Sequence, residues 1–193
     1  MYQAIFLPVE WESRNEGGAH LSEQQPRLNI VLFEPQIPQN TGNIARTCAC
    51  TGARLHLVGP MGFSIDDKKL KRAGLDYWHF LDISYYSSTA EFLEQHAADH
   101  LFFFTTKGRK VYSEQSYPDD SYLIFGREDA GLEEEILLHH PEQCLRLPMI
   151  GPVRSLNLSN TVAIATYETL RQWGFPALQN EGQLHRYCWE QAE

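Results

Sequence analysis

The sequence predicts an α/β fold in which a parallel β-sheet is covered by helices on both faces. Two features of the chain lead to this fold class. Short, continuously apolar runs recur along it, as in strands that are buried on both faces, and segments with helical patterning separate these runs. Strands that alternate with helices in this way form parallel sheets, because each helix carries the chain back to the same edge.

Six strands are expected, and the first has the clearest pattern. Leu28–Phe33 (LNIVLF) is a continuous apolar run, which favours a central strand. The sequence does not define the borders of the third strand, so it is placed only within Tyr77–Tyr86. The other four expected strands are Leu55–Val58, Leu101–Thr105, Tyr122–Phe125 and Cys144–Leu147.

Five helices are expected around the sheet. The first, Asn40–Ala53, has Asn40 or Thr41 as its N-cap, because amide and hydroxyl side chains satisfy the first backbone N–H groups of a helix. Gly52 is the expected stop of this helix. The other four expected helices are Asp66–Ala73, Ser88–Ala97, Leu132–Leu138 and Leu156–Trp173.

The 193 residues are expected to form one main domain with an appendage at each end. Residues 1–27 are predicted to be an N-terminal extension, to which the sequence assigns no role. Residues 28–176 contain all the expected strands and helices. Residues 177–193 are predicted to be a C-terminal tail that packs loosely.

The composition narrows the classes of function. The chain has 16 Lys and Arg against 25 Asp and Glu, a net charge of −9, which argues mildly against nucleic-acid binding. Local patches do the binding, however, and the segment from Arg46 to Arg72 is rich in cations. The cysteines and histidines lack the spacing of zinc ligands, so no metal site is expected. No membrane span or export signal is found, so the cytoplasm is the expected compartment.

Three loops that follow expected strands carry the candidate site, because open α/β sheets bind ligands at the carboxyl ends of their strands. The first loop, residues 34–43, leads into a helix N-terminus, where anions bind. Asn43 and Arg46 are three residues apart and share one face of that helix. Either they grip a phosphate or ribose, or Asn43 caps the helix and Arg46 is a solvated charge. The spacing alone does not decide between these alternatives.

The second loop is Phe125–Leu132. Gly126 would allow a ligand to approach the backbone closely, and Glu128 lies near the start of the next helix. A dinucleotide-binding loop has glycines that make room for a pyrophosphate, whereas the carboxylate here would repel a phosphate. The loop therefore favours a hydroxyl-rich or cationic ligand.

The third loop is Leu147–Asn160. Its apolar residues, two prolines and one glycine make a stiff loop with exposed backbone groups, which suits the binding of an adenine. Ser155, Asn157 and Ser159 gather at the start of the last helix. The alternative for this cluster is simple capping of that helix.

Together, the three loops resemble the signature motifs of the SPOUT superfamily of methyltransferases. These motifs are Asn-x-Gly-Asn-Ile-x-Arg at Asn40–Arg46, Phe-Gly-x-Glu-x-x-Gly-Leu at Phe125–Leu132, and Pro-Met with Arg-Ser-Leu-Asn-Leu-Ser-Asn inside Leu147–Asn160. Two further segments, Asp66–Tyr77 and Thr105–Gly108, resemble one branch, the tRNA (cytidine/uridine-34-2′-O)-methyltransferases. The motifs match in order and spacing from residue 28 to about 176, so the resemblance is specific.

The resemblance implies a fold and a cofactor. The fold would be the parallel α/β sheet with a deep C-terminal trefoil knot, a rare exception to the usual rules of chain topology. The cofactor would be S-adenosyl-L-methionine, with S-adenosyl-L-homocysteine as product. The residues at the matching cofactor-binding positions are Phe104, Gly126, Glu128, Leu147, Ile150, Ser155 and Asn157.

The resemblance also implies a substrate and an assembly. The substrate would be the 2′-hydroxyl of nucleotide 34 in the anticodon stem-loop of tRNA. The enzyme would be a cytoplasmic homodimer in which the partner subunit completes each site, with neither a membrane nor a metal involved. The candidate RNA-binding residues are Arg154, Lys107, Lys68 and Arg72.

The candidate catalytic residues are Arg46, Asn43 and Tyr167. An arginine is protonated at neutral pH, because its ordinary pKa is about 12.5 or higher. Arg46 is therefore expected to hold the ribose or its phosphate and to stabilise negative charge on the 2′-oxygen. Tyr167 either reaches the pocket from the last helix or packs in the core. The general base is not identified by the sequence.

Two other functions fit the same motifs. One is a SPOUT 2′-O-methyltransferase that acts on ribosomal RNA or on another position of tRNA. The other is an RNA-binding relative that has lost methyl transfer. The retained motif residues Asn43, Arg46 and Glu128 argue against the second alternative.

Overall fold

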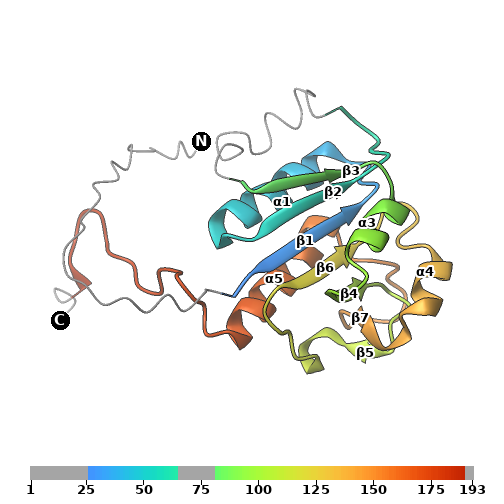
Figure 1. Ribbon diagram of the computed structural model, residues 1–193. Helices are drawn as coiled ribbons and strands as arrows, with labels where there is room; N and C mark the ends of the chain where they lie inside the picture. Colours follow the sequence, from blue (N-terminus) through green and yellow to red (C-terminus); the bar gives the residue numbers. More distant parts are fainter. Residues whose placement is uncertain (1–25, 65–80, 190–193) are drawn as a thin grey trace.

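The computed structural model describes residues 26–64 and 81–189, which build one parallel β-sheet with helices on both faces (Figure 1). Each pair of neighbouring strands runs in parallel. In spatial order the strands are β3 (Ile83–Tyr86), β2 (Arg54–Val58), β1 (Leu28–Phe33), β6 (Ser121–Phe125), β4 (His100–Phe104), β7 (Cys144–Arg146) and β5 (Lys110–Val111). Leu32 pairs with Phe125, which pairs with Phe104, so the carboxyl ends of the central strands lie at one edge.

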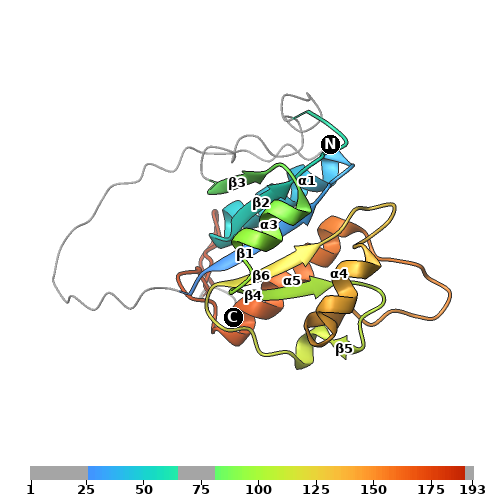
Figure 2. The same cartoon turned by 45° about the vertical axis from the view of Figure 1, so that its right-hand side comes forward.

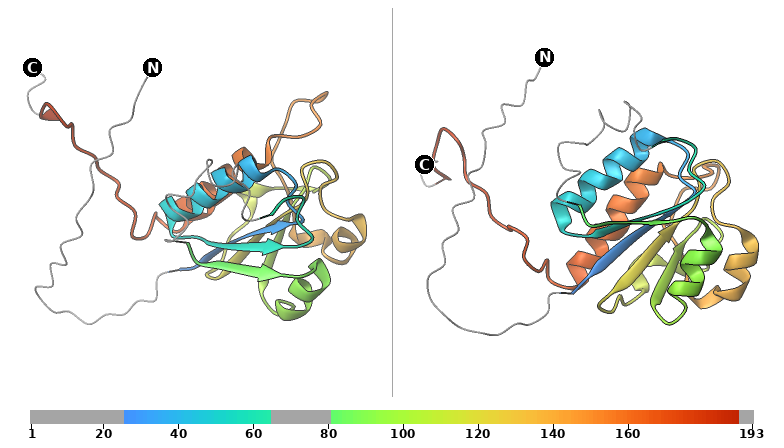
Figure 3. Two further views of the ribbon diagram at one scale, coloured as in Figure 1. Left: turned by 90° about the horizontal axis from the view of Figure 1, so that it is seen from above. Right: turned by 45° about the horizontal axis from the view of Figure 1, so that its top comes forward.

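Strand β1 shows why the sheet is covered on both sides. All six of its residues are buried, and they alternate between two cores. Ile30 and Leu32 point to one core, whereas Val31 and Phe33 point to the other. Figure 3 shows α1 and α5 side by side over the first core, with α3 and α4 on the opposite face. The bounds of the helices are α1 (Pro38–Thr51), α3 (Thr89–Gln95), α4 (Glu134–His139) and α5 (Leu158–Gln172).

The predicted fold class is confirmed, and β1 has the predicted bounds. The predicted N-cap of the first helix is wrong. Helix α1 starts at Pro38, and its N-cap is Ile37, which makes no side-chain capping bond. Proline suits this first position because its fixed φ is helical and the N–H that it lacks has no partner there in any case. Gly52 ends the helix as predicted, with a φ of 73°.

Several short elements were not predicted from the sequence. Strand β5 has two residues, and two single turns of 3₁₀ helix, Tyr112–Glu114 and Pro141–Gln143, precede β6 and β7. The expected helix Asp66–Ala73, with the candidate RNA-binding residues Lys68 and Arg72, lies outside the described residues. Of the interval that was expected to hold the third strand, β3 occupies the last four residues.

Two long segments leave the sheet. Figure 2 shows the connection between β7 and α5, residues 147–157, extending away from the strands. The described part of the tail, residues 177–189, contains no strand and no α-helix, and it runs away from the sheet (Figure 1). The division of the chain into extension, domain and tail stays a prediction.

Polar side chains from β1, β2 and β3 form a largely buried row of hydrogen bonds. The Nε2 atom of His56 on β2 lies 3.2 Å from Oδ1 of Asn29, and its Nδ1 atom lies 3.0 Å from the hydroxyl of Tyr86. The Nδ2 group of Asn29 donates to the carboxylate of Asp120 over 3.0 Å and to the carbonyl of Ser121 over 3.4 Å. Burial, with smaller contributions from nearby cations, lowers the pKa of His56 from 6.5 to about 4. The folded protein therefore holds His56 neutral at neutral pH.

This histidine gives the first testable prediction. Below pH 6.5 the unfolded chain takes up a proton at His56 that the folded chain does not, so the free energy of unfolding falls as the pH drops toward 4. Near pH 4, His56 lowers the free energy of unfolding by about 2–3 kcal/mol relative to neutral pH. Chemical denaturation at pH 7 and at pH 4.5 measures this loss. The difference in stability between the two pH values should be smaller for His56→Gln than for the wild type, but unchanged for the exposed control His100→Gln. Equal losses in the wild type and His56→Gln would refute this assignment.

Candidate active site

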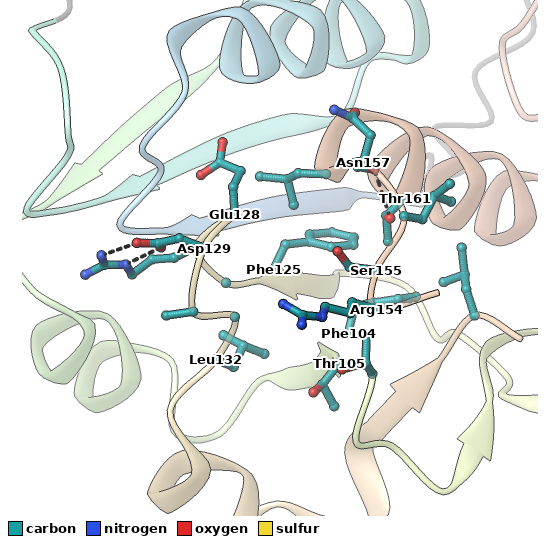
Figure 4. Close-up of a pocket in the computed structure, with 18 of the residues that line it drawn as sticks. Phe104, Thr105, Phe125, Glu128, Asp129, Leu132, Arg154, Ser155, Asn157 and Thr161 are labelled. Atoms are coloured by element: carbon teal, nitrogen blue, oxygen red, sulfur yellow. Dashed lines mark hydrogen bonds and ion pairs between the residues drawn. The ribbon is translucent and has the colours of Figure 1, made fainter. Parts of the chain in front are cut away.

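A pocket of about 550 Å³ opens at the carboxyl ends of β6, β4 and β7, three neighbouring strands of the sheet (Figure 4). Its walls come from the loops that follow these strands and from the start of α1. Six of the seven residues expected at the cofactor line it: Phe104, Gly126, Glu128, Leu147, Ser155 and Asn157. The structure thus brings together three loops whose linking residues are far apart in the sequence: Asn40 lies 88 positions from Glu128 and 117 positions from Asn157.

The seventh expected residue, Ile150, does not line the pocket. Its side chain is 78% exposed, and Met149 lines the wall instead. Two of the residues expected to bind RNA, Lys107 and Arg154, also belong to the wall. In Figure 4 the side chain of Arg154 lies beside Ser155, across the pocket from Glu128.

The second loop closes on itself at Gly126. The backbone groups of Arg127 and Gly131 exchange two hydrogen bonds of 2.9 and 3.2 Å. A Cβ atom at Gly126 would overlap the backbone of Gly131 and Leu132, so this position requires glycine. The sequence suggested that Gly126 makes room for a ligand, whereas the close neighbour in the structure is the loop's own backbone. The same residue therefore sets the shape of the loop.

Glu128 binds the stretch of backbone that leads into α1. Its carboxylate accepts hydrogen bonds from the backbone N–H groups of Gln36, at 2.9 Å, and Ile37, at 3.2 Å. It also accepts one from Nδ2 of Asn40 over 3.1 Å. A negative charge at this end of a helix is favoured by the helix dipole, and hydrogen bonds to a carboxylate are among the stronger ones in proteins. The second loop is thus fastened to the first.

Asn40 carries the connection on to the third loop. Its Oδ1 atom accepts a hydrogen bond of 3.1 Å from Nδ2 of Asn157. The Oδ1 atom of Asn157 in turn accepts from the N–H groups of Ser159, at 2.9 Å, and Asn160, at 3.3 Å. The capping alternative for this cluster is therefore confirmed for Asn157. A continuous set of hydrogen bonds, from Glu128 through Asn40 to Asn157, links all three loops of the pocket.

Arg127 stiffens the same loop from outside. Its guanidinium holds the carboxylate of Asp129 with two hydrogen bonds of 2.9 and 3.0 Å, and it reaches Glu34 over 3.3 Å. The two carboxylates raise the pKa of Arg127, and Arg127 lowers the pKa of Asp129. Both acidic side chains of the second loop are therefore engaged by protein groups. Their charge disfavours a phosphate in this part of the pocket.

The three expected catalytic residues lie outside the pocket wall. Asn43, Arg46 and Tyr167 are exposed on α1 and α5, the two helices that pack side by side. Asn43 is not the N-cap of α1, so the capping alternative is wrong for it. Tyr167 is 49% exposed, so the expectation that it packs in the core is also wrong. Arg46 is six residues beyond Asn40, which lines the pocket, or about 9 Å further along the helix axis.

Asn40 and Met149 are among the lining residues that sequence reasoning missed. Asn40 was expected only as a helix cap, whereas it links the first loop to the other two. Its position as the first residue of the first motif was the available signal. Met149 lies next to the expected Ile150, and no pattern in an irregular loop separates these two neighbours.

No group of three or more His, Cys, Asp or Glu side chains within 26–64 and 81–189 is placed to hold a metal ion. No helix in those ranges is both long and apolar enough to cross a membrane.

The fold and the pocket together indicate the class of protein. A parallel sheet whose strand-end loops enclose a pocket with apolar and polar walls is typical of α/β proteins that bind a nucleotide-like cofactor. The particular family follows from residues 27–167, which match the SpoU rRNA Methylase family. The chain belongs to this family, which confirms the resemblance to SPOUT methyltransferases.

Three relatives illustrate the match. The tRNA (cytidine(34)-2′-O)-methyltransferase of Escherichia coli (strain K12) is 52% identical over 150 residues, which cover 77% of this chain and 96% of the relative. A solved structure that concerns the 2-OH methylation of C/U34 on tRNA is 46% identical, with a TM-score of 0.74 and coverage of 78% of this chain and 98% of the other. The AdoMet-bound rRNA methyltransferase from Sinorhizobium meliloti is 26% identical, with a TM-score of 0.68, and covers 78% of this chain and 58% of its own.

These comparisons confirm the fold of the SPOUT methyltransferases for this chain. The trefoil knot stays a prediction, and so do the roles of the individual site residues.

Proposed function

We propose that the chain is an S-adenosyl-L-methionine-dependent methyltransferase that acts on the ribose 2′-hydroxyl of nucleotide 34, a cytidine or uridine, in the anticodon loop of tRNA. The observation that carries this proposal is the near-complete match to a relative named for that reaction, at 52% identity. The pocket supports it, because the three motif loops that resemble those of the family meet there. The cytoplasm, where tRNA is modified, is the proposed compartment.

The pocket fits the proposed cofactor. Leu147 and Met149 provide apolar surface for an adenosine, and the stacked rings of Phe104 and Phe125, with centroids 4.8 Å apart, form the buried floor beneath it. Ser155 adds a hydroxyl, and the backbone of the second and third loops adds hydrogen-bonding groups. The volume of about 550 Å³ lies within the range of small-molecule sites.

When bound, S-adenosyl-L-methionine supplies an electrophilic methyl group and becomes S-adenosyl-L-homocysteine. The chain's own part is to bind and align the ribose and to stabilise the charge that develops on its 2′-oxygen. We assign this to Arg46, whose planar guanidinium suits a ribose or phosphate oxygen. Asn43 lies on the same exposed face of α1 as Arg46. Arg154 and Lys107, at the pocket wall, are the proposed contacts to the RNA backbone.

A homodimer would bring these residues to a pocket. Arg46 does not line the pocket of its own chain. A second subunit that packs on the α1–α5 layer would bring its own pocket to Arg46. Six large apolar side chains are exposed on the first loop, the third loop and α5: Ile37, Ile150, Val153, Leu156, Ile164 and Tyr167. Ile37 and Leu156 also line the pocket, so these side chains offer a partner subunit apolar contacts next to it. We therefore propose that Arg46 and Tyr167 of one subunit serve the pocket of its partner.

The function is tested by methyl transfer to tRNA. The purified protein is incubated with unmodified tRNA and methyl-labelled cofactor, and the product is mapped by nuclease digestion and mass spectrometry. The proposal predicts one ribose methyl group at nucleotide 34. A methyl group at another tRNA position or in ribosomal RNA, or RNA binding without transfer, would contradict it and favour one of the two alternative functions.

Arg46 is tested by substitution. Arg46→Ala should reduce methyl transfer by at least 100-fold, because positioned charge stabilisation of this kind contributes roughly 10²–10³ in rate. Its affinity for the cofactor should remain within a few-fold of the wild type. Cys50→Ala is the matched control, since Cys50 is exposed one turn further along α1, and it should keep full activity. Survival of activity in Arg46→Ala would show that the assigned role is wrong.

A further inference from the structure

A group of cations lies beside the pocket at the edge of the sheet. Lys107, Arg109 and Lys110 follow β4 closely, and no acidic residue occurs between positions 105 and 113. Arg146 on β7 joins them, because it pairs with Val111 across the sheet and donates a 2.8 Å hydrogen bond to the carbonyl of Thr106. These four cations, Lys107, Arg109, Lys110 and Arg146, are called the β5 cationic strip below. In a chain with a net charge of −9, four cations gathered in this way mark a surface on which an anionic partner can bind.

The strip is both rigid and accessible. A Cβ atom at Gly108 would lie only 2.8 Å from the carbonyl carbon of Leu145, so the turn rests directly on β7. Strand β5 is the last strand of the sheet among the described residues, which leaves its outer side without a neighbouring strand. The side chains of Lys107 and Lys110 are 49% and 46% exposed. The strip begins at the pocket itself, since Lys107 lines the wall.

Each lysine of the strip is held by a carboxylate. Lys107 pairs with Glu134 over 2.9 Å, and Lys110 pairs with Glu142 over 2.7 Å. The lysines lower the pKa of both carboxyl groups, so the two glutamates are ionised at neutral pH. Their side chains are 74% and 77% exposed, and ion pairs in such positions contribute little to stability. In such an exposed pair, another anion readily replaces the glutamate as the partner of the lysine.

We propose that the β5 cationic strip binds the phosphate backbone of the RNA next to the nucleotide that enters the pocket, and that Glu134 and Glu142 compete with these phosphates for the two lysines. This proposal rests on the proposed function, because it takes RNA as the partner. Lys107 and Lys110 are three residues apart, at most about 10 Å along the chain, which keeps the contacts close to the reacting nucleotide. The contacts are sequence-independent, as backbone contacts are, and serve to position the RNA.

The proposal predicts that two variants change the affinity for tRNA in opposite directions. The dissociation constant for tRNA is measured with the full-length protein between about 50 and 200 mM salt, where phosphate contacts dominate the salt dependence. The double variant Arg109→Gln/Lys110→Gln should bind tRNA about tenfold more weakly. The slope of the logarithm of the association constant against log salt should become less negative by about 1–2. Glu142→Gln frees Lys110 from its competitor and should bind two- to threefold more tightly.

Arg54→Gln is the matched control. Arg54 is also an exposed cation in an ion pair, with Asp82 at 2.8 Å, but it lies at the amino end of β2, away from the pocket. Its affinity for tRNA and its salt slope should equal those of the wild type. Thermal unfolding and the affinity for S-adenosyl-L-methionine are measured for each variant and should be unchanged.

The outcomes separate this inference from the proposed function. If the wild type methylates nucleotide 34 but the double variant binds tRNA with unchanged affinity and slope, the strip proposal is overturned and the function stands. If Glu142→Gln weakens binding as the double variant does, competition is excluded and the proposal is also overturned. If the wild type binds tRNA with the predicted dependence on the strip but transfers no methyl group, the strip proposal is supported and the proposed function fails.

Discussion

The pocket depends on one carboxylate. Glu128 accepts hydrogen bonds from two backbone N–H groups that precede α1 and from Asn40 on its first turn. The positive end of the α1 dipole and the charge of the carboxylate stabilise each other. Because Asn40 is bonded in turn to Asn157, the same contact fixes the start of α5. Without Glu128, the N–H groups of Gln36 and Ile37 and the amide of Asn40 would lose a shared partner.

This arrangement gives preorganisation rather than direct contact with a reacting group. A site performs best when its loops are held in the productive geometry by hydrogen bonds outside the reaction itself. Here Gly126 allows the second loop to close, and the bonds of Glu128 then fasten that closed loop to α1. Arg127 adds a further constraint from the outside by engaging Asp129. The motif residues of this protein thus serve as structural supports of the pocket as well as its walls.

The sequence predicted those features that depend on neighbouring residues. Strand β1 was found because five of the six residues of Leu28–Phe33 are apolar, which favours a strand in a sheet covered on both faces. The end of α1 at Gly52 was found because a left-handed residue at a helix end favours glycine. The convergence of the three loops followed from their shared position after parallel strands, together with the family resemblance.

Features that depend on distant residues were missed. The N–H groups that lead into α1 are bound by a side chain about 90 positions away, which no rule based on local sequence detects. Strand β5 has two residues, too few for any periodic pattern, and it exists because Gly108 allows the chain to rest on β7. The exposed position of Tyr167 follows from how α1 and α5 pack, and packing leaves no signal in the spacing of the motifs.

Amide hydrogen exchange at Gln36 and Ile37 tests the central constraint most directly. If the carboxylate of Glu128 holds these two N–H groups, Glu128→Gln should speed their exchange about tenfold or more and weaken the binding of S-adenosyl-L-methionine. Amides in the last turn of α1 should be unaffected. Asp129→Asn, which alters the neighbouring carboxylate that contacts Arg127, should leave both amides as they are in the wild type. Unchanged exchange and unchanged cofactor affinity in Glu128→Gln would contradict the account.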